Sequence, residues 1–335
     1  MKILITGITG MVGSHLLDFL IDNTDAEIIG ISRWRSPLNN ISRHIPLINK
    51  KERIFLENCD IRDSLGVDHL FSKHKFEYIF HLAAQSYPHV SFTNPLETYQ
   101  TNIDGTENIL SATLKYSPKA IVHVCSSSEV FGRVSKDKVP IDEETNFHPA
   151  SPYAISKCGT DLIGRYYAEA YDLNTQVTRM FTHTGPRRGD VFMESTFAKQ
   201  IALIEYGYQD PVVKVGNLDS MRTIADVRDA VKAYWKLLTT SPQPGAYYNI
   251  GGKKSLKVGD ILRDLISLST NKTIEFKIDK ERLRPIDADL QIPNIAKFVK
   301  KTGWSPSISY ENTLEDLLNY WRERIEKEGN TFLER

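Results

Sequence analysis

The chain has 335 residues, 41% of them hydrophobic, which is enough to bury the core of one large domain or of two unequal ones. Lysine plus arginine and aspartate plus glutamate each number 42, so the formal net charge is zero and the basic footprint of a nucleic-acid-binding protein is missing. No apolar run reaches the length of a membrane span, and the N-terminus enters a predicted strand at once. We therefore expect a cytoplasmic protein with neither a membrane nor a nucleic-acid partner.

The chain begins with an apolar run, a glycine-rich turn and an amphipathic segment. Lys2–Ile5 predicts a strand, and Met11–Leu20 predicts a helix. Between them, Gly7 permits a tight turn, and Gly10 lets the backbone approach a pyrophosphate closely. Gly13 lets the helix pack closely on the strand, so that the N–H groups at the start of the helix face the phosphate charge. Surface turns also produce glycine triplets, but the flanking strand and helix favour a dinucleotide site.

The second predicted strand, Glu27–Ser32, ends without the carboxylate that would accept the free hydroxyls of an adenosine ribose. Arg33 and Arg35 follow it instead, and guanidinium groups pair with phosphate in charge-assisted geometry. The alternative is that both arginines are solvated loop charges. We expect a ribose that carries a 2′-phosphate, and hence NADP in preference to NAD.

Short β-rich runs alternate with helical patterns through the first half of the chain. The expected strands are Lys2–Ile5, Glu27–Ser32, Arg53–Glu57, Tyr78–His81, Ala120–Cys125 and Gln176–Met180. The alternation predicts an α/β fold with a doubly wound parallel sheet of the Rossmann type, which binds ligands at the carboxyl ends of its strands. We expect residues 1–181 to bind the cofactor and to carry the catalytic residues.

Beyond about Thr182 the pattern changes to longer loops that contain proline and glycine. They separate predicted helices such as Ala225–Leu238, Val258–Leu268 and Thr313–Ile325. We expect residues 182–335 to form a smaller, mixed α/β region that mainly binds substrate, with a chain that can cross back to the sheet. The three cysteines, Cys59, Cys125 and Cys158, are scattered at spacings unlike those of metal ligands, and we expect no metal site.

Hydroxyl and carboxylate side chains follow the predicted strand Ala120–Cys125, among them Ser127 and Glu129. About two dozen residues later, Tyr153 and Lys157 are four residues apart and so share one face of a predicted helix. An ammonium group close to a phenol stabilises phenolate, which lowers the tyrosine pKa from about 10 and makes a base. Such pairs are often structural, but after a dinucleotide turn and a hydroxyl-rich strand end this pair favours catalysis.

These motifs together resemble the extended short-chain dehydrogenase/reductases, and within them the sugar-nucleotide branch. The resemblance runs over nearly the whole chain through TGITGMVGSH, NCDIRD, HLAAQS, SSSEVFG and YAISK. It implies that Ser127 hydrogen-bonds the sugar O4, that Tyr153 is the base, and that Lys157 also holds the nicotinamide ribose. The implied cofactor-binding residues are Gly7, Thr9, Gly10, Met11, Val12, Gly13, Arg33, Arg35, Asp60, Ile61, Leu82, Ala83, Ala84, Tyr153 and Lys157.

Several segments look like those of GDP-mannose 4,6-dehydratases, among them GISRWRSPLNNISRHI, AAQSYPHVSF, GPRRGD and VGNLDSMR. The run that begins at FAKQIALIEYGYQDP is equally similar to the GDP-4-keto-6-deoxymannose reductases. The chain departs from the dehydratase pattern at Thr182 and Thr184, where Asn and Glu are usual, and at Thr223, where Asp is usual. The exact hexose or heptose therefore stays open, and guanine rests on the resemblance alone.

Glu129 favours a dehydratase, because 4,6-elimination needs a carboxylate that takes the C5 proton once C4 is a ketone. A simple reductase needs no such base, although some relatives keep a glutamate there, and an exposed loop carboxylate is the other alternative. We expect a GDP-sugar 4,6-dehydratase of the GDP-mannose or GDP-manno-heptose type that recycles its NADP internally. A reductase or epimerase of GDP-4-keto-6-deoxy sugars, and a non-catalytic dinucleotide-binding module, are the alternatives.

For the nucleotide half of the substrate, Arg222 and Arg284 resemble the family's diphosphate and ribose contacts, whereas Lys199 and Lys214 are equally explained as solvated charges. The segment Arg35–Lys50 predicts a long loop with apolar residues that needs a partner surface, or else a disordered flap. In the resembling dehydratases this region reaches a neighbouring subunit, so we expect a homodimer or homotetramer. The expected substrate-binding residues are Ser86, Ser127, Ser128, Glu129, Thr182, Arg187, Lys199, Lys214, Arg222 and Arg284.

Overall fold

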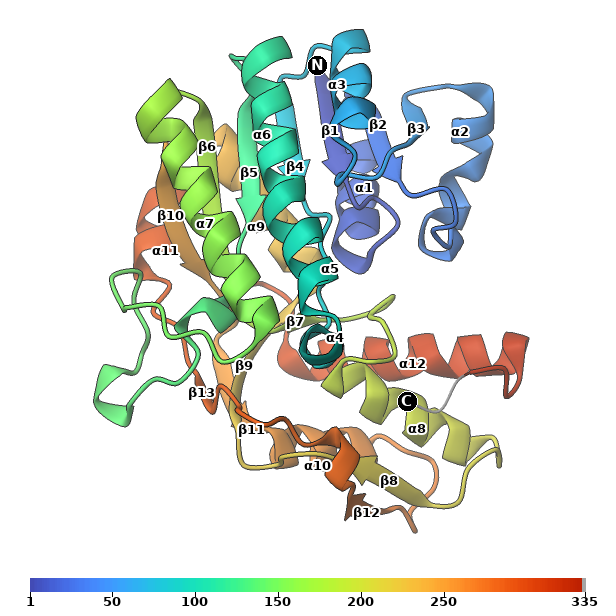
Figure 1. The fold of residues 1–335 in the computed structure, drawn as a ribbon. Helices are drawn as coiled ribbons and strands as arrows, with labels where there is room; N and C mark the ends of the chain where they lie inside the picture. Colours follow the sequence, from blue (N-terminus) through green and yellow to red (C-terminus); the bar gives the residue numbers. More distant parts are fainter. Residues whose placement is uncertain (333–335) are drawn as a thin grey trace.

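A seven-stranded parallel sheet in the order β10-β6-β5-β4-β1-β2-β3 forms the centre of the molecule (Figure 1). Its strands are β1 (Lys2–Thr6), β2 (Glu27–Ser32), β3 (Ile54–Asn58), β4 (Tyr78–His81), β5 (Ile121–Cys125), β6 (Asn174–Met180) and β10 (Ala246–Ile250). The structure is a computed structural model that describes residues 1–332, so the last three residues of the region expected at 182–335 lie outside it. The predicted Rossmann-type sheet is confirmed, and the six strands expected from the sequence all form.

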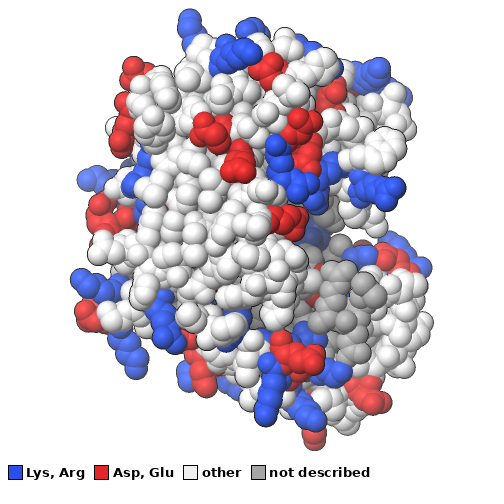
Figure 2. Space-filling model, in the orientation of Figure 1, with Lys and Arg blue, Asp and Glu red and all other residues white. Residues whose placement is uncertain are grey.

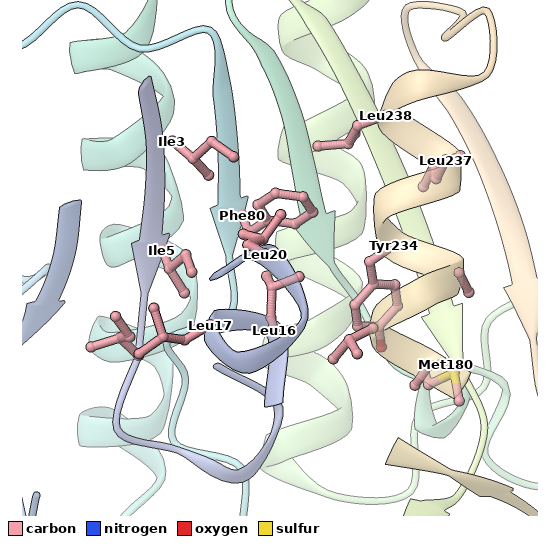
Figure 3. Close-up of a cluster of buried hydrophobic side chains, with 14 of the residues drawn as sticks. Ile3, Ile5, Leu16, Leu17, Leu20, Phe80, Met180, Tyr234, Leu237 and Leu238 are labelled. Atoms are coloured by element: carbon pink, nitrogen blue, oxygen red, sulfur yellow. The ribbon is translucent and has the colours of Figure 1, made fainter. Parts of the chain in front are cut away.

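Helices cover both faces of the sheet because side chains along each strand alternate between the two faces. Ile3 and Ile5 of β1 pack with α1 (Met11–Asn23) and α9 (Val227–Thr239), as Figure 3 shows for the buried side chains around Tyr234. Leu4 belongs to the cluster on the opposite face. There the sheet is covered by α3 (Ser64–Lys73), α6 (Gly105–Tyr116) and α7 (Pro152–Tyr171), of which α6 and α7 lie at the front of Figure 1.

The chain returns to the sheet after residue 182. Strand β10 pairs with β6 in parallel, and α9 packs beside α1. The predicted helix Ala225–Leu238 starts two residues late, because Ala225 and Asp226 end strand β9 (Met221–Asp226). The Asp226 carboxylate then accepts a hydrogen bond from the Arg228 N–H and caps α9.

The smaller region lies below the sheet in Figure 1, at the carboxyl ends of its strands. Its strands are β7 (His183–Thr184), β8 (Val212–Val215), β9, β11 (Lys254–Lys257), β12 (Glu275–Ile278) and β13 (Leu290–Gln291). Its helices are α8 (Met193–Glu205), α10 (Val258–Ser267) and α12 (Tyr310–Glu328), which share an apolar core that contains Trp321, while α11 (Ala296–Thr302) packs beside β10. Among the helices of residues 1–332, none has both the length and the apolar character required to cross a membrane.

The segment expected as a long loop at Arg35–Lys50 is largely helical, which corrects that expectation. A 3₁₀ turn over Asn39–His44 leads into α2 (Ile45–Lys50), with Pro46 in its first turn. Ile41 is fully buried against the core on the α1 side, and the Asn40 amide donates to the Thr9 carbonyl at 2.9 Å. The apolar residues of this segment therefore find much of their partner surface within the same chain.

Two short helices, α4 (Pro88–Thr93) and α5 (Pro95–Tyr99), follow β4 and lead through a π-helical turn at Gln100–Asp104 into α6. After β5, the chain makes a 3₁₀ turn at Ser128–Phe131 before it enters α7. These turns place the segments that follow β4 and β5 at the same edge of the sheet as the glycine turn after β1.

Candidate active site

A cleft of about 970 Å³ lies between the carboxyl ends of the parallel strands and the smaller region. Residues that follow β1 through β6 all line it, as do residues of the segment 279–287. It brings together most of the residues singled out from the sequence. These are Gly7, Thr9, Gly10, Met11, Val12, Gly13, Arg33, Asp60, Ile61, Leu82, Ala83, Ala84, Ser86, Ser127, Ser128, Glu129, Tyr153, Lys157, Thr182, Arg187, Lys214, Arg222 and Arg284.

The glycine turn has the geometry that a dinucleotide diphosphate requires. Gly7 has a φ of +70°, and a Cβ there would lie 3.0 Å from the backbone of Ala83. A Cβ on Gly13 would lie 2.3 Å from the Gly7 carbonyl, so that only glycine lets α1 pack this closely. Gly10 is the N-cap of α1 and supplies no side-chain cap, which leaves the first N–H groups of the helix to face the cleft. The residues present fit a nicotinamide dinucleotide.

Beyond β2, a polar set consisting of Ser32, Arg33, Ser36 and Asn40 lines the cleft. This set carries hydroxyl, guanidinium and amide donors and no carboxylate, which suits a phosphate better than two ribose hydroxyls. Arg35 is exposed and does not line the cleft.

After β3, the Asp60 carboxylate is held by the Arg62 guanidinium at 2.7 Å. This hydrogen bond holds the pKa of Asp60 below its ordinary value, so the carboxylate stays ionised next to Arg33. Asp60 therefore presents a fixed anion to the cleft, which can accept hydrogen bonds from an adenine amino group.

Ser127, Tyr153 and Lys157 converge because the end of β5 packs against the first turns of α7. The Ser127 hydroxyl accepts the Glu129 N–H at 3.2 Å, and the Ser151 hydroxyl caps α7 just before Tyr153. Tyr153 and Lys157 are both buried. Their side chains, four residues apart, reach the cleft from one face of the helix.

The electrostatics of this pair differ from the expectation that Lys157 lowers the tyrosine pKa. Burial raises the pKa of Tyr153 above its ordinary value, while a hydrogen bond with Ser127 and the charge of Arg188 act in the opposite direction. The Lys157 ammonium donates to the Cys125 carbonyl at 2.7 Å, and burial lowers its pKa. In the free protein, desolvation of the phenol therefore outweighs the charges around it.

Glu129 faces a group of charged side chains from the smaller region. Its Oε1 lies 3.6 Å from Nη1 of Arg284, and the same Nη1 lies 3.7 Å from Oδ1 of Asp287. Arg222 lies on the other side of Asp287, with its Nη2 donating to Oδ1 at 3.3 Å. Glu129, the expected base, and Arg222 and Arg284, the expected nucleotide contacts, thus belong to one row of alternating charges.

The structure does not bring three of the expected contacts fully into the cleft. Lys199 is buried, does not line the cleft and pairs with Asp190 at 3.2 Å. Arg35 is exposed outside the cleft, in the turn that leads from β2 to the 3₁₀ segment. Arg187 reaches the wall of the cleft, but its Nη2 pairs with the Asp18 carboxylate of α1 at 2.8 Å.

The threonines that depart from the dehydratase pattern have different environments. Thr182 lines the cleft, whereas Thr184 is buried in β7. The Thr223 hydroxyl is 2.6 Å from the Ser255 hydroxyl and donates to the Gln291 carbonyl at 3.0 Å, so it joins β9 to β11 and to β13. Thr223 is therefore a structural residue of the small sheet.

Sequence reasoning missed His183, Arg188 and Glu194, which all line the cleft. The Arg188 guanidinium lies 3.6 Å from the centre of the Phe192 ring, and burial lowers its pKa. Burial, followed by the charge of Arg188, lowers the pKa of His183 to about 4, so this imidazole is neutral. For Arg188 the sequence does hold a signal, because GPRRGD carries two adjacent arginines, Arg187 and Arg188.

Comparisons with known proteins assign the chain to a family. The protein family described as GDP-mannose 4,6 dehydratase matches residues 4–317. The chain is 29% identical over 329 residues to a GDP-6-deoxy-D-mannose reductase from Pseudomonas aeruginosa, covering 98% of this chain and 99% of the relative. It is 28% identical over 355 residues to a GDP-mannose 4,6-dehydratase from Yersinia enterocolitica, covering 95% of this chain and 92% of the relative.

Among solved structures, the fold is similar to that of RMD from Pseudomonas aeruginosa complexed with NADPH. The TM-score is 0.82 at 27% sequence identity, and the comparison covers 96% of this chain and 99% of the other. The resemblance to a sugar-nucleotide branch of the short-chain dehydrogenase/reductases is thereby confirmed. Since the family match spans nearly the whole sequence, this chain belongs to the GDP-mannose 4,6 dehydratase family.

Proposed function

We propose that this protein is a GDP-sugar 4,6-dehydratase that converts a GDP-mannose-type substrate into a GDP-4-keto-6-deoxy sugar. The observation that carries the proposal is the position of Glu129, whose carboxylate lines the same cleft as Ser127, Tyr153 and Lys157. Elimination across C5 and C6 needs such a second base, in addition to the group that deprotonates O4. The names of the family and of the Yersinia enterocolitica relative support the same substrate and reaction.

The cofactor in this proposal is NADP, held by the glycine turn with Asp60 at the adenine end. Arg33, Ser36 and Asn40 would hold its 2′-phosphate, and Lys157 its nicotinamide ribose. When bound, this cofactor would supply the hydride acceptor for C4 of the sugar and, once reduced, the hydride donor for C6. Net turnover therefore consumes no reductant.

The chain's own residues supply the proton transfers. Tyr153 removes the O4 proton while Ser127 hydrogen-bonds O4. Glu129 then takes the C5 proton, which the new C4 ketone has made acidic. The electron pair of the C5–H bond forms the C5–C6 double bond, and the C6 oxygen takes the proton that Glu129 has just accepted and leaves as water. Hydride addition at C6 and protonation of C5 by a solvent-derived proton complete the 4-keto-6-deoxy product, and Tyr153 releases the O4 proton to solvent.

The substrate's nucleotide would occupy the part of the cleft formed by the smaller region. Lys214, Arg222 and Arg284 line this part and supply positive charge for the diphosphate. Ser86 and Thr182 also line the cleft and would offer hydroxyls to the sugar.

The second candidate is a reductase of GDP-4-keto-6-deoxy sugars, favoured by the name of the Pseudomonas aeruginosa relative. A single incubation series separates the candidates. The purified protein is incubated with GDP-mannose and other nucleotide sugars without added cofactor, and the masses of the products are measured by mass spectrometry. Loss of one water supports the dehydratase. Conversion of a 4-keto-6-deoxy sugar only when NADPH is added supports the reductase, and no conversion at all supports a binding module.

We also propose a homodimer or homotetramer. Leu96 of α5 and Ile155, Leu162 and Tyr166 of α7 are exposed apolar or aromatic side chains. Figure 2 shows a broad area almost free of charge over α7 and the neighbouring helices. An uncharged helical face of this kind is typical of an interface between subunits. Light scattering at micromolar concentration tests it, and a monomer mass would contradict it.

A further inference from the structure

Four charged side chains form an alternating row across the substrate half of the cleft. The row begins at Glu129, which follows β5 in the sequence, and continues through Arg284 to Asp287 and Arg222. All four residues line the cleft, and at neutral pH their formal charges sum to zero. The row joins the proposed C5 base to the two arginines that would meet the substrate's diphosphate.

The two arginines of the row are held very differently. Arg222 donates to the carbonyls of Met221 and Ala288, both at 2.9 Å, and to Asp287 at 3.3 Å, and its side chain is 11% exposed. Arg284 has only its two ion pairs, at 3.6 and 3.7 Å, and within residues 1–332 it donates no hydrogen bond. Its side chain is 27% exposed. The guanidinium of Arg284 therefore keeps its donors for a ligand while it remains beside Glu129.

Asp287 is already committed to other partners. It accepts hydrogen bonds from the Ser220 hydroxyl at 2.9 Å and from the Asn217 amide at 3.2 Å. Burial alone would raise the pKa of Asp287, but Arg222 and Arg284 hold it below its ordinary value. This ionised carboxylate is anchored and balances the charge of the well-held Arg222. Arg284 is thus the cation that remains for Glu129 and for an incoming anion.

We propose that Arg284 is a positioning residue that binds the substrate's diphosphate and Glu129 at the same time, so that the nucleotide end of the substrate aligns the base with C5. A guanidinium has five N–H donors in a fixed fork and can serve two anions at once. The side chain of Glu129 is only 17% exposed and has this one cation to orient it among the described residues. The inference rests on the proposed dehydratase function and assigns Arg284 an effect on elimination as well as on binding.

The test compares Arg284→Gln with Arg222→Gln, the matched control on the far side of Asp287. Both variants lose a diphosphate contact, so both should raise KM for the nucleotide sugar. Arg284→Gln alone should also lower kcat for water loss by about tenfold, together with the incorporation of solvent deuterium at C5. Arg284→Lys should recover part of kcat. Retained NADP binding in each variant verifies that the cofactor half is folded.

A double-mutant cycle shows whether Arg284 acts through Glu129. If it does, adding Arg284→Gln to Glu129→Gln should leave the residual kcat unchanged. An Arg284→Gln enzyme whose kcat at saturation equals that of the wild type overturns the inference alone, because Arg284 then only binds the nucleotide. A wild-type protein that releases no water from any GDP sugar overturns the proposed function, and the inference with it.

Discussion

At the scale of single residues, Tyr153 is held in an environment that opposes its ionisation. Burial raises its pKa, and only the hydrogen bond with Ser127 and the charge of Arg188 offset part of that rise. A base with a raised pKa holds its proton more tightly, so the fraction of reactive phenolate grows as the pH rises. We therefore expect proton removal from O4 to become faster with pH across the neutral range.

Tyr153→Phe removes the ionisable oxygen and leaves the ring that fills the buried site. We expect turnover to fall by at least about 100-fold, because general-base catalysis is lost, while NADP binding stays within about twofold of the wild type. Turnover is measured by water loss in the nucleotide-sugar incubation, and NADP binding by calorimetric titration. A variant with a near-normal rate would show that another group deprotonates the sugar.

At the scale of elements, Asp18 of α1 ties together three parts of the cofactor site. Its carboxylate lies 2.7 Å from Nε2 of His44, 2.9 Å from Nε of Arg43 and 2.8 Å from Nη2 of Arg187. Helix α1, which follows the glycine turn, is thus joined to the 3₁₀ turn at Asn39–His44 and to the segment after β7 that carries Arg187 and Arg188. Arg187 has a φ of +68°, and this strained turn directs its guanidinium to Asp18 of α1, although Arg187 and Arg188 both line the cleft.

The residues that follow β2 are expected to determine whether the protein prefers NADP or NAD. Arg33→Ala should weaken NADP binding by at least about tenfold and NAD binding little, because only NADP carries the phosphate that the guanidinium would pair with. Arg35→Ala is the matched control, since this arginine lies outside the cleft and its loss should leave both affinities unchanged. Calorimetric titration of both cofactors decides. Equal weakening of NADP and NAD by Arg33→Ala would assign the arginine a structural role.

At the scale of the whole molecule, buried neutral histidines make stability depend on pH. Burial lowers the pKa of His81 and of His123 to about 3, and that of His15 to about 4. Below the ordinary histidine pKa of about 6.5, the unfolded chain therefore binds more protons than the folded one. The stability these groups contribute is complete above pH 6.5 and is lost progressively as the pH falls toward the folded-state values.

We expect each of these histidines to cost about 2 kcal/mol of unfolding free energy between pH 6.5 and pH 5. Urea unfolding from pH 5 to pH 8 measures the slope. His123→Phe is the informative variant, because the ring also packs near Phe80 and Tyr234 and the substitution removes one titrating group. Below pH 6.5, the slope of the unfolding free energy against pH should then correspond to about one proton fewer than in the wild type. A stability that is flat between pH 5 and pH 6.5 would contradict the prediction.

The sheet and the cofactor half of the cleft could be predicted because their signals are local. Each strand is an apolar run bounded by turn residues, and parallel topology brings the ends of such strands to one edge. The glycine turn, Ser127 and the Tyr153–Lys157 pair follow from that rule without any knowledge of the smaller region.

Other features depended on partners distant in the sequence. The helical segment at 39–50 is stabilised by Asp18 and by the core beneath Ile41, so its composition alone looked like an unpartnered loop. Lys199 lies on a helix that is buried on nearly every side, where it pairs with Asp190. The spacing of apolar residues in the sequence identifies such a helix, but it does not indicate which of the charged side chains of the helix reach solvent.

By itself, the sequence determined the sheet, the dinucleotide turn and the residue types available for acid–base chemistry, because periodicity and turn residues act over a few neighbouring positions. Only the tertiary structure decided which of two adjacent arginines, Arg187 and Arg188, pairs with Asp18. It also decided that Arg284 lies beside Glu129. These contacts join segments far apart in the chain, and they form only once packing of the two regions has fixed the walls of the cleft.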